Sequence, residues 1–330
     1  MIDLESKVKG KEIRIVFTEG KDLRMMKAAV LLQQKGLLIP ILYGDRKELL
    51  DLADRHGLDL SDIPLLDVKE FQDKEAMLHR MLELRKGKAD RDMVEAWYQK
   101  DSYFCTMYVE MGFADGLLGG STNSTADTLR PIMQLIKTSP GNSIVSSCFL
   151  MCKEQEHYIF ADCSLNRNPN VDQLVEIALQ SANSAKSLGI TPCVALLSYS
   201  TYGSGSGEDV DLVKEAATRL QRLPLDYLVD GELQVDCALN PEVAKLKAPQ
   251  SKVGGQANVL VFPDLNAANI GYKLVANLGG YQAYGPILQG VRLPMNDLSR
   301  SANVEEIYTM ALITASQKLN MKPTCTSSQP

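Results

Sequence analysis

The sequence is poor in histidine, the residue that most often serves as a general base or a metal ligand. Only three of its 330 residues are histidine, and His56, His79 and His157 each stand alone among charged or helical-looking segments. A Ser-His-Asp triad or a zinc site would have to recruit one of them. The sequence therefore disfavours both mechanisms, and we predict that the protein has no metal site.

An excess of basic charge is also absent. The chain carries 35 Lys and Arg against 41 Asp and Glu, which gives a net charge of −6. Proteins that bind nucleic acid or anionic membranes need a basic excess to neutralise the phosphates. We therefore expect neither partner. A small anionic ligand would need a local cluster of arginine or lysine against this acidic background.

Long apolar runs are missing as well. No run reaches the roughly 20 residues that a membrane-spanning helix needs, and residues Met1 to Lys7 lack the basic-then-apolar pattern of a signal peptide. The seven cysteines lie mostly in apolar runs, such as Cys148 and Cys152 around Phe149–Met151. Such cysteines are typical of buried thiols in a reducing compartment, so we expect a cytoplasmic protein.

Short apolar runs alternate with helical segments along the chain, which is typical of a doubly wound α/β fold with parallel sheets. Strands are predicted at 13–17, 37–43, 63–68, 193–199, 227–232 and 258–264, helices at 23–34, 46–56, 171–188, 210–219 and 266–278, mainly helical segments at 74–97 and 102–111, and hairpin strands at 146–151 and 158–162. A chain of this length exceeds the size of a single core. We therefore predict two domains, with a boundary at the turn Ser139–Asn142.

The stretch Gly285–Arg300 is dense in Gly, Pro, Asn and Asp, so we predict a loop or turn there. It ends in Ser299-Arg300, just before an apolar run from Ile307 to Ala315 that predicts a helix. A hydroxyl and a guanidinium before a helix N-terminus favour a phosphate or another oxyanion. The alternative is a surface loop whose arginine caps a backbone carbonyl.

Two other loops could hold an anion. Leu117–Pro131 combines a glycine pair with a hydroxyl-rich segment that enters a helix, where the hydroxyls either cap the helix or bind an oxyanion. Ser200–Asp209 is rich in glycine and lies between a strand and a helix, but it lacks the Gly-Lys-Ser/Thr ending of a Walker P-loop. It is equally consistent with a flexible lid or a linker.

Seven segments together resemble the phosphate acetyltransferases, also called phosphotransacetylases. They are Ala114–Leu117, Ser124–Pro131, Leu197–Thr201, Asp230–Gln234, Val261–Leu265, Gly285–Gly290 and Asn296–Arg300, in order over nearly the whole chain. The related phosphate butyryltransferases share the fold, but Asp230–Gln234 and Asn296–Arg300 resemble the acetyl enzymes more.

The resemblance implies two doubly wound αβα domains with the active site in the cleft between them, similar to isocitrate and isopropylmalate dehydrogenases. The first domain would comprise residues 1–141 plus 289–330, and the second residues 142–288. The implied reaction is reversible acetyl transfer between coenzyme A and phosphate in a ternary complex. Coenzyme A is then a substrate, no cofactor or metal is needed, and the protein is expected to be a cytoplasmic homodimer.

The same resemblance implies roles for individual residues. Ser299 and Arg300 match the pair that binds the phosphate of acetyl phosphate, and Arg85 and Arg130 match two further anion-binding arginines. Glu306 stands six residues after Arg300, where the family carries an aspartate as the base for the coenzyme A thiol. Asn123, Ser124 and Thr125 are the remaining candidate substrate-binding residues.

Four positions depart from the family pattern. Glu306 replaces an aspartate, and its spacing from Asn303 also matches a capping box, a purely structural motif. Asn123 stands where the family usually has histidine, and Tyr202 and Ser206 stand where lysines are common.

These departures leave two rival interpretations open. One is a catalytically silent homologue that binds coenzyme A or acyl phosphates, and the other is an acyltransferase similar to the phosphate butyryltransferases. A dehydrogenase of similar shape is disfavoured because no Gly-x-Gly-x-x-Gly follows a strand.

Overall fold

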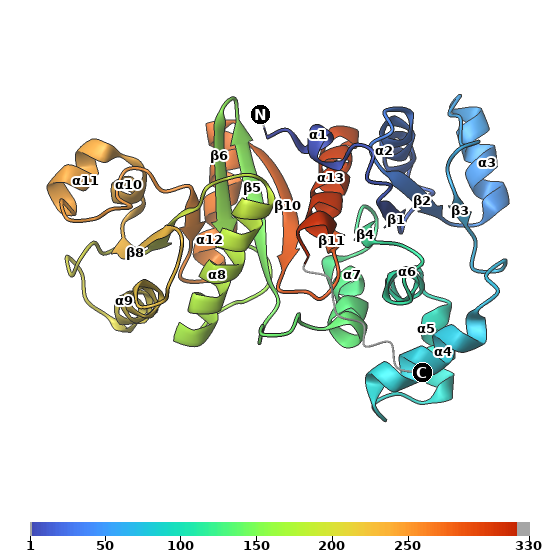
Figure 1. Ribbon diagram of the computed structural model, residues 1–330, viewed down its shortest axis with the longest axis horizontal. Coiled ribbons are helices and arrows are strands. Elements are labelled where there is room, and N and C mark those ends of the chain that lie inside the picture. Colours follow the sequence, from blue (N-terminus) through green and yellow to red (C-terminus); the bar gives the residue numbers. More distant parts are fainter. Residues whose placement is uncertain (1, 322–330) are drawn as a thin grey trace.

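The structure contains two sheets flanked by helices, which makes it a mixed α/β protein (Figure 1). It is a computed structural model, and it describes residues 2–321. The first sheet has the order β11-β4-β1-β2-β3 and is parallel throughout. Its strands are β1 (Arg14–Phe17), β2 (Ile39–Tyr43), β3 (Leu65–Leu66), β4 (Gly116–Gly119) and β11 (Met295–Asp297).

Both faces of the first sheet are covered by helices, as its continuous apolar strands require. Along β1, Ile15 and Phe17 point to one core and Val16 to the other. The first core is covered by α1 (Leu4–Val8), α2 (Leu23–Gln34), α3 (Arg46–Arg55) and α13 (Val304–Asn320). The second is covered by α4 (Lys74–Arg85), α5 (Arg91–Tyr98), α6 (Asp101–Glu110), α7 (Thr125–Pro131) and the π-helical turn η1 (Ile132–Ile136).

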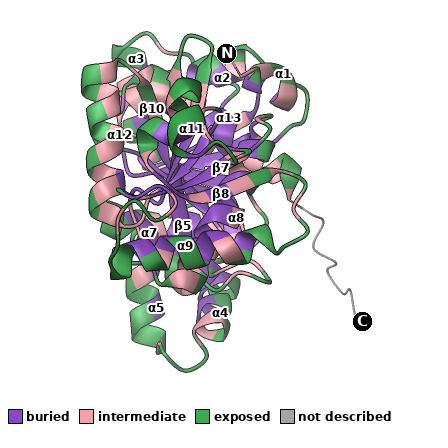
Figure 2. Ribbon diagram, turned by 90° about the vertical axis from the view of Figure 1, so that its left-hand side faces the viewer, coloured by how far each residue is buried: buried purple, intermediate pink, exposed green. Residues whose placement is uncertain are grey.

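The second sheet is mixed and has the order β10-β5-β6-β9-β7-β8. The β10–β5 and β5–β6 pairs are antiparallel and the other pairs are parallel. Its strands are β5 (Ser146–Lys153), β6 (Glu156–Ala161), β7 (Cys193–Leu197), β8 (Leu228–Leu233), β9 (Val259–Val261) and β10 (Gln282–Gln289). The flanking helices are α8 (Val171–Ser187), α9 (Glu208–Gln221), α10 (Val235–Leu239), α11 (Pro241–Lys247) and α12 (Leu265–Gly279). Figure 2 shows the buried strands at the centre and the exposed outer faces of the helices around them.

The βαβ pattern predicted from the sequence is confirmed, including the helix at 23–34 and the hairpin of β5 and β6. The helical segment 74–97 is divided into α4 and α5, because Lys86 ends α4 in the left-handed conformation. None of the described helices is long and apolar enough to cross a membrane.

The prediction of a loop over Gly285–Arg300 was wrong for half of its length, because β10 and β11 occupy residues 282–289 and 295–297. Gly285 and Pro286 fit into β10 because this is an edge strand whose register shifts between Tyr284 and Ile287. In β11 the buried Asn296 accepts from the Leu288 N–H (2.8 Å) and donates to Thr314 and Gln317. Tertiary hydrogen bonds thus make a strand from residues typical of turns.

The chain crosses between the sheets at two places that lie side by side. The Ser139 N–H donates to the Gly290 carbonyl (2.8 Å), and the Ser139 hydroxyl donates to the Val291 carbonyl (2.8 Å). The division into residues 1–141 plus 289–330 and 142–288 stays a prediction, as does the likeness to dehydrogenases.

Candidate functional site

The carboxyl ends of β1, β4 and β11 meet at one edge of the first sheet. β1 is followed along the chain by β2 on one side, whereas β4 lies on its other side, so the strand order changes direction between β1 and β4. Ligands of open α/β sheets bind outside the carboxyl ends of the strands at such a switch point. The residues that emerge there are Thr18 to Arg24, Gly120 to Thr125, and Leu298 to Arg300.

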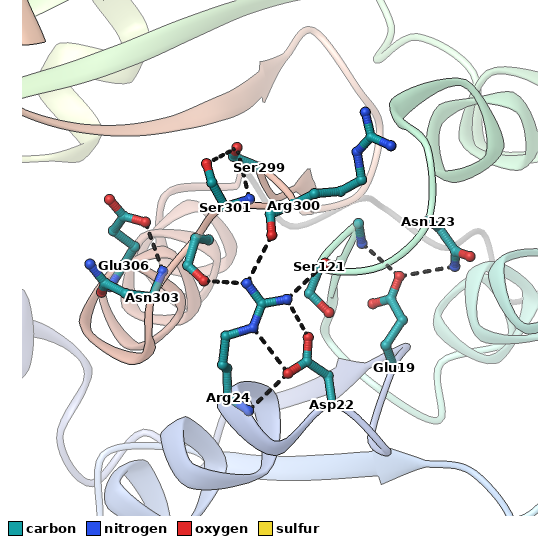
Figure 3. Close-up of polar contacts among 12 residues, drawn as sticks. Glu19, Asp22, Arg24, Ser121, Asn123, Ser299, Arg300, Ser301, Asn303 and Glu306 are labelled. Atoms are coloured by element: carbon teal, nitrogen blue, oxygen red, sulfur yellow. Dashed lines mark hydrogen bonds and ion pairs between the residues drawn. The ribbon is translucent and has the colours of Figure 1, made fainter. Parts of the chain in front are cut away.

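Arg24 joins the loops that follow β4 and β11 (Figure 3). One terminal nitrogen donates to the carbonyls of Arg300 (2.9 Å) and Ala302 (2.7 Å), and the other donates to the carbonyl of Ser121 (2.9 Å). Asp22 holds the guanidinium in an ion pair of 2.6 Å. Only the planar fork of arginine offers this many donors at once, so Arg24 fixes the two loops relative to one another.

Glu19 is buried between β1 and the loop after β4. Its carboxylate accepts from the Thr18 hydroxyl (2.6 Å), the Gly120 N–H (2.8 Å) and the Asn123 side-chain amide (2.9 Å). Burial raises the pKa of Glu19, because an ionised carboxylate loses hydration there, and the three donors offset only part of that effect. Figure 3 shows Glu19 and Asn123 facing one another beside the Arg24 cluster.

Asp297 ends β11 and is completely buried, with a side chain 0% exposed. Neither of its carboxylate oxygens has a hydrogen bond of normal geometry within residues 2–321. Desolvation raises the pKa of Asp297 to about 6, the hydroxyls of Thr125 and Thr128 offset part of this, and the charge of Glu19 adds to it. Gly120 makes room for Asp297: its φ is +93°, and a Cβ there would lie 2.0 Å from the Asp297 Oδ1.

Ser299 and Arg300 are exposed at the start of the loop after β11. The Ser299 hydroxyl lies 2.8 Å from the Ser301 hydroxyl. The guanidinium of Arg300 makes no hydrogen bond or ion pair with any described residue, and Figure 3 shows it directed away from the Arg24 cluster. In this loop it is Arg24, rather than Arg300, that caps backbone carbonyls, so the cation of Arg300 is open to an anionic ligand.

Glu306 takes part in a complete capping box at the start of α13. Its carboxylate accepts from the Asn303 N–H (2.9 Å), and the Asn303 side chain accepts from the Glu306 N–H (2.9 Å). Glu306 also lines a cavity of about 440 Å³ with Ser299. The opposite wall belongs to the second sheet and α12 and includes Phe149, Tyr272 and Tyr284. The capping role is therefore present in the structure, and the side chain still reaches a ligand-sized space.

Asn123, Ser124 and Thr125 form the entrance to α7. The Ser124 hydroxyl caps α7 by accepting from the Asp127 N–H (3.2 Å) and donating to the Asp127 carboxylate (2.6 Å). Thr125 is exposed, and Asn123 is half-buried against Glu19. The capping alternative is thus realised for Ser124.

Arg85 and Arg130 both act on Tyr103: burial raises the pKa of its phenol, and the two cations offset part of that rise. Arg85 donates to the Gln134 carbonyl (3.1 Å) and lies 5.9 Å from the centre of the Trp97 ring. Its Nε is buried without a partner among the described residues, whereas Arg130 is exposed. No described contact joins either arginine to Arg300, so a shared role for the three stays a prediction.

Comparison with known proteins assigns this chain to a family. A family model described as phosphate acetyl/butaryl transferase matches residues 1–315. The chain belongs to the phosphate acetyl/butaryl transferase family.

Several curated proteins and solved structures resemble this chain over almost its whole length. It is 45% identical over 321 residues to the phosphate acetyltransferase of Staphylococcus epidermidis, an alignment that covers 96% of this chain and 98% of that protein. A phosphotransacetylase from Streptococcus pyogenes superposes with a TM-score of 0.93 at 46% identity, and the EutD phosphotransacetylase from Staphylococcus aureus with a TM-score of 0.90 at 44% identity; each comparison covers 96% of this chain and 97% of the other. A branched-chain phosphotransacylase from Enterococcus faecalis shares the fold at a TM-score of 0.71 and 18% identity, covering 92% of this chain and 98% of that one.

Three residues of this family member were missed by sequence reasoning, namely Glu19, Arg24 and Asp297. Glu19 lies two residues after β1, Arg24 lies in the first turn of α2, and Asp297 is the last residue of β11. Polar residues at the carboxyl ends of predicted parallel strands are therefore the signal that could have found them. Nothing in the sequence marks which of them share one edge until the strand order is known.

The buried Asp297 predicts a pH-dependent stability. Because its pKa is raised in the folded state from 3.8 to about 6, Asp297 stabilises the fold below about pH 4 relative to neutral pH, and this contribution is lost as the pH rises through about 6. Asp297→Asn mimics the protonated form. The variant should therefore gain free energy of unfolding over wild type between these pH values, by up to roughly 3 kcal/mol. Urea denaturation across the range measures this, and parallel curves for the two proteins would contradict it.

Proposed function

We propose that this chain is a phosphate acetyltransferase, which transfers an acetyl group reversibly between coenzyme A and phosphate. The observation that carries the proposal is the guanidinium of Arg300, which has no protein partner within residues 2–321 and whose neighbour Ser299 lines a cavity with Glu306. A planar cation free of protein partners suits the oxygens of a phosphoryl group. The relatives of 44–46% identity named above, which are phosphate acetyltransferases, support the choice of the acetyl reaction.

The proposed reaction proceeds by direct transfer in a ternary complex. The thiol of coenzyme A gives its proton to the carboxylate of Glu306, and the thiolate attacks the carbonyl carbon of acetyl phosphate. A carbon–sulfur bond forms, the bond between the acetyl carbon and the phosphate oxygen breaks, and phosphate leaves. A base is useful because an ordinary thiol has a pKa of about 8.5, and Arg300 stabilises the charge that grows on the phosphate.

The other candidate residues take supporting roles in this proposal. Arg85 and Arg130 hold further anionic groups of the substrates, and Asn123, Ser124 and Thr125 line the phosphate side. The site lies in the cleft between the two domains predicted above, which the cavity between α12, β10 and the start of α13 supports. Coenzyme A enters as a substrate, and the reaction needs no other cofactor.

We also propose that the enzyme is a cytoplasmic homodimer. Ile270, Leu274 and Leu278 follow one another at helical spacing on α12 and are 58%, 52% and 82% exposed. An apolar stripe of this kind is typical of a surface that another chain covers. The six cysteines within residues 2–321 are free thiols, which suits a reducing compartment.

The reaction is tested by mixing the purified chain with acetyl phosphate and coenzyme A and following thioester formation. The expected result is rapid acetyl-coenzyme A formation without added cofactor. Parallel assays with butyryl phosphate measure acyl preference. Faster transfer of butyryl would favour the butyryltransferase alternative, and binding of both substrates without turnover would identify a silent homologue.

Arg300→Ala should lower kcat/KM by an amount that corresponds to about 2–4 kcal/mol of transition-state stabilisation, seen mainly in kcat. Arg300→Lys should restore activity only in part, because the bidentate fork is lost. Arg219→Ala serves as the matched control, since Arg219 is an exposed arginine of α9 paired with Asp172 and Glu215. Near-normal kcat/KM in Arg300→Ala would refute the role of Arg300.

Glu306→Gln separates catalysis from capping. The amide oxygen can still accept from the Asn303 N–H, so the free energy of unfolding should barely change. Turnover should fall by about 10²- to 10⁴-fold, because the basic carboxylate is gone, while Glu306→Asp should keep substantial activity. Asn303→Ala is the control: it should cost about 1 kcal/mol of stability and leave turnover nearly intact. Full activity of Glu306→Gln at neutral pH would make Glu306 a helix cap only.

A further inference from the structure

A second buried carboxylate at this edge of the sheet, besides Asp297, is that of Glu19. The residue is 8% exposed, and no ion pair to it is present among residues 2–321. Burying a carboxylate is costly unless hydrogen bonds compensate. The carboxylate adds no apolar contact to the cores on either side of β1. Its contribution to the structure must therefore come from the groups to which it is hydrogen-bonded.

Those groups tie the end of β1 to the loop that enters α7. Oε1 of Glu19 accepts both from the Gly120 N–H and from the side chain of Asn123, and Oε2 accepts from Thr18. The bond to Glu19 is the one hydrogen bond of the Asn123 side chain to the described part of the chain. Ser124 and Thr125 follow at once, so Glu19 fixes the position from which α7 begins.

Glu19 cannot act on a substrate directly in this arrangement. Both of its oxygens are used by donors from the protein, and its side chain lies beneath the loop rather than in the 440 Å³ cavity. On the far side of the same loop, Arg24 holds the carbonyl of Ser121 together with that of Arg300. The loop is therefore held from below by Glu19 and from the side by Arg24 (Figure 3).

We propose that Glu19 is a positioning residue for acetyl transfer, which acts through Gly120 and Asn123 to hold the Gly120–Thr125 loop where it meets the phosphate group. The inference rests on the proposed function for its kinetic consequence. In this proposal the side-chain amide of Asn123 links the loop to Glu19 by donating a hydrogen bond to Oε1. What the loop requires of Glu19 is an acceptor at Oε1, and not a negative charge.

Two substitutions at Glu19 distinguish an acceptor from a charge. Glu19→Gln keeps an oxygen for Gly120 and Asn123, and its new NH₂ group can donate to the Thr18 hydroxyl, so kcat and both KM values should stay within about threefold of wild type. Glu19→Ala removes every bond and should lower kcat/KM for acetyl phosphate by about 10- to 100-fold, because small misplacements of binding groups have effects of this size. KM for coenzyme A should change by less than about threefold.

A third variant covers the case in which Glu19→Ala fails to fold. Asn123→Ala removes the hydrogen bond between Asn123 and Glu19 by changing the donor instead of the acceptor. It should raise KM for acetyl phosphate about tenfold. Combined with Glu19→Gln, it should cause no further loss than Asn123→Ala alone. Asp67→Ala is the matched control, since Asp67 is a buried carboxylate at the carboxyl end of β3 that accepts from the N–H groups of Arg46 and Lys69. It should lose stability but keep its kinetic constants per folded molecule.

Calorimetric titration with inorganic phosphate makes the outcome independent of turnover. Wild type and Glu19→Gln should bind phosphate alike, and Glu19→Ala and Asn123→Ala should bind about tenfold more weakly. If wild type binds phosphate but transfers no acetyl group, the proposed function fails and the phosphate affinities still decide the role of Glu19. Loss of phosphate affinity in Glu19→Gln equal to that in Glu19→Ala would overturn the proposal, and so would unchanged affinity in Asn123→Ala.

Discussion

The parallel pairing of β11 with β4 is the constraint on which the site depends. Met295, Asn296 and Asp297 lie beside Leu117, Leu118 and Gly119, so a segment almost 180 residues later in the chain ends at the same sheet edge. That pairing places the Ser299-Arg300 turn next to the entrance of α7. Without it, Arg24 could not bind the carbonyls of Ser121 and Arg300 together.

Buried carboxylates recur where the strands of both sheets give way to loops. Glu19 and Asp297 do so in the first sheet. In the second sheet Asp162 accepts from the N–H groups of Ser164, Leu165 and Asn166, and Glu232 accepts from the Gly203 N–H at 2.7 Å. Glu19, Asp162 and Glu232 each accept from backbone N–H groups that no strand satisfies. The fold thus uses buried carboxylates to fix the loops that follow its strands.

The sequence predicted the local elements well, because apolar strands and amphipathic helices each produce a pattern within a few neighbouring residues. It also predicted Arg300 as an anion-binding residue, and that guanidinium has no partner among residues 2–321. It failed at β10 and β11, where Gly285, Pro286 and Asn296 are turn-forming residues that long-range hydrogen bonds hold in strands. The sequence could not show that Glu19 and Asp297 share one edge of the sheet, since Gly120, beside which both carboxylates lie, is 100 or more residues away from each.

The helix α13 belongs to both halves of the molecule. Met310 and Ile313 share one core cluster with Ile15 of the first sheet and Leu150 of the second, and α13 contacts β4 and β1 as well as β10 and α8. A rotation of one sheet away from the other would expose part of that shared core to water, at about 25 cal/mol for each Å². The two halves should therefore unfold in one cooperative transition, and amide hydrogens in α13 should exchange only when the whole chain opens.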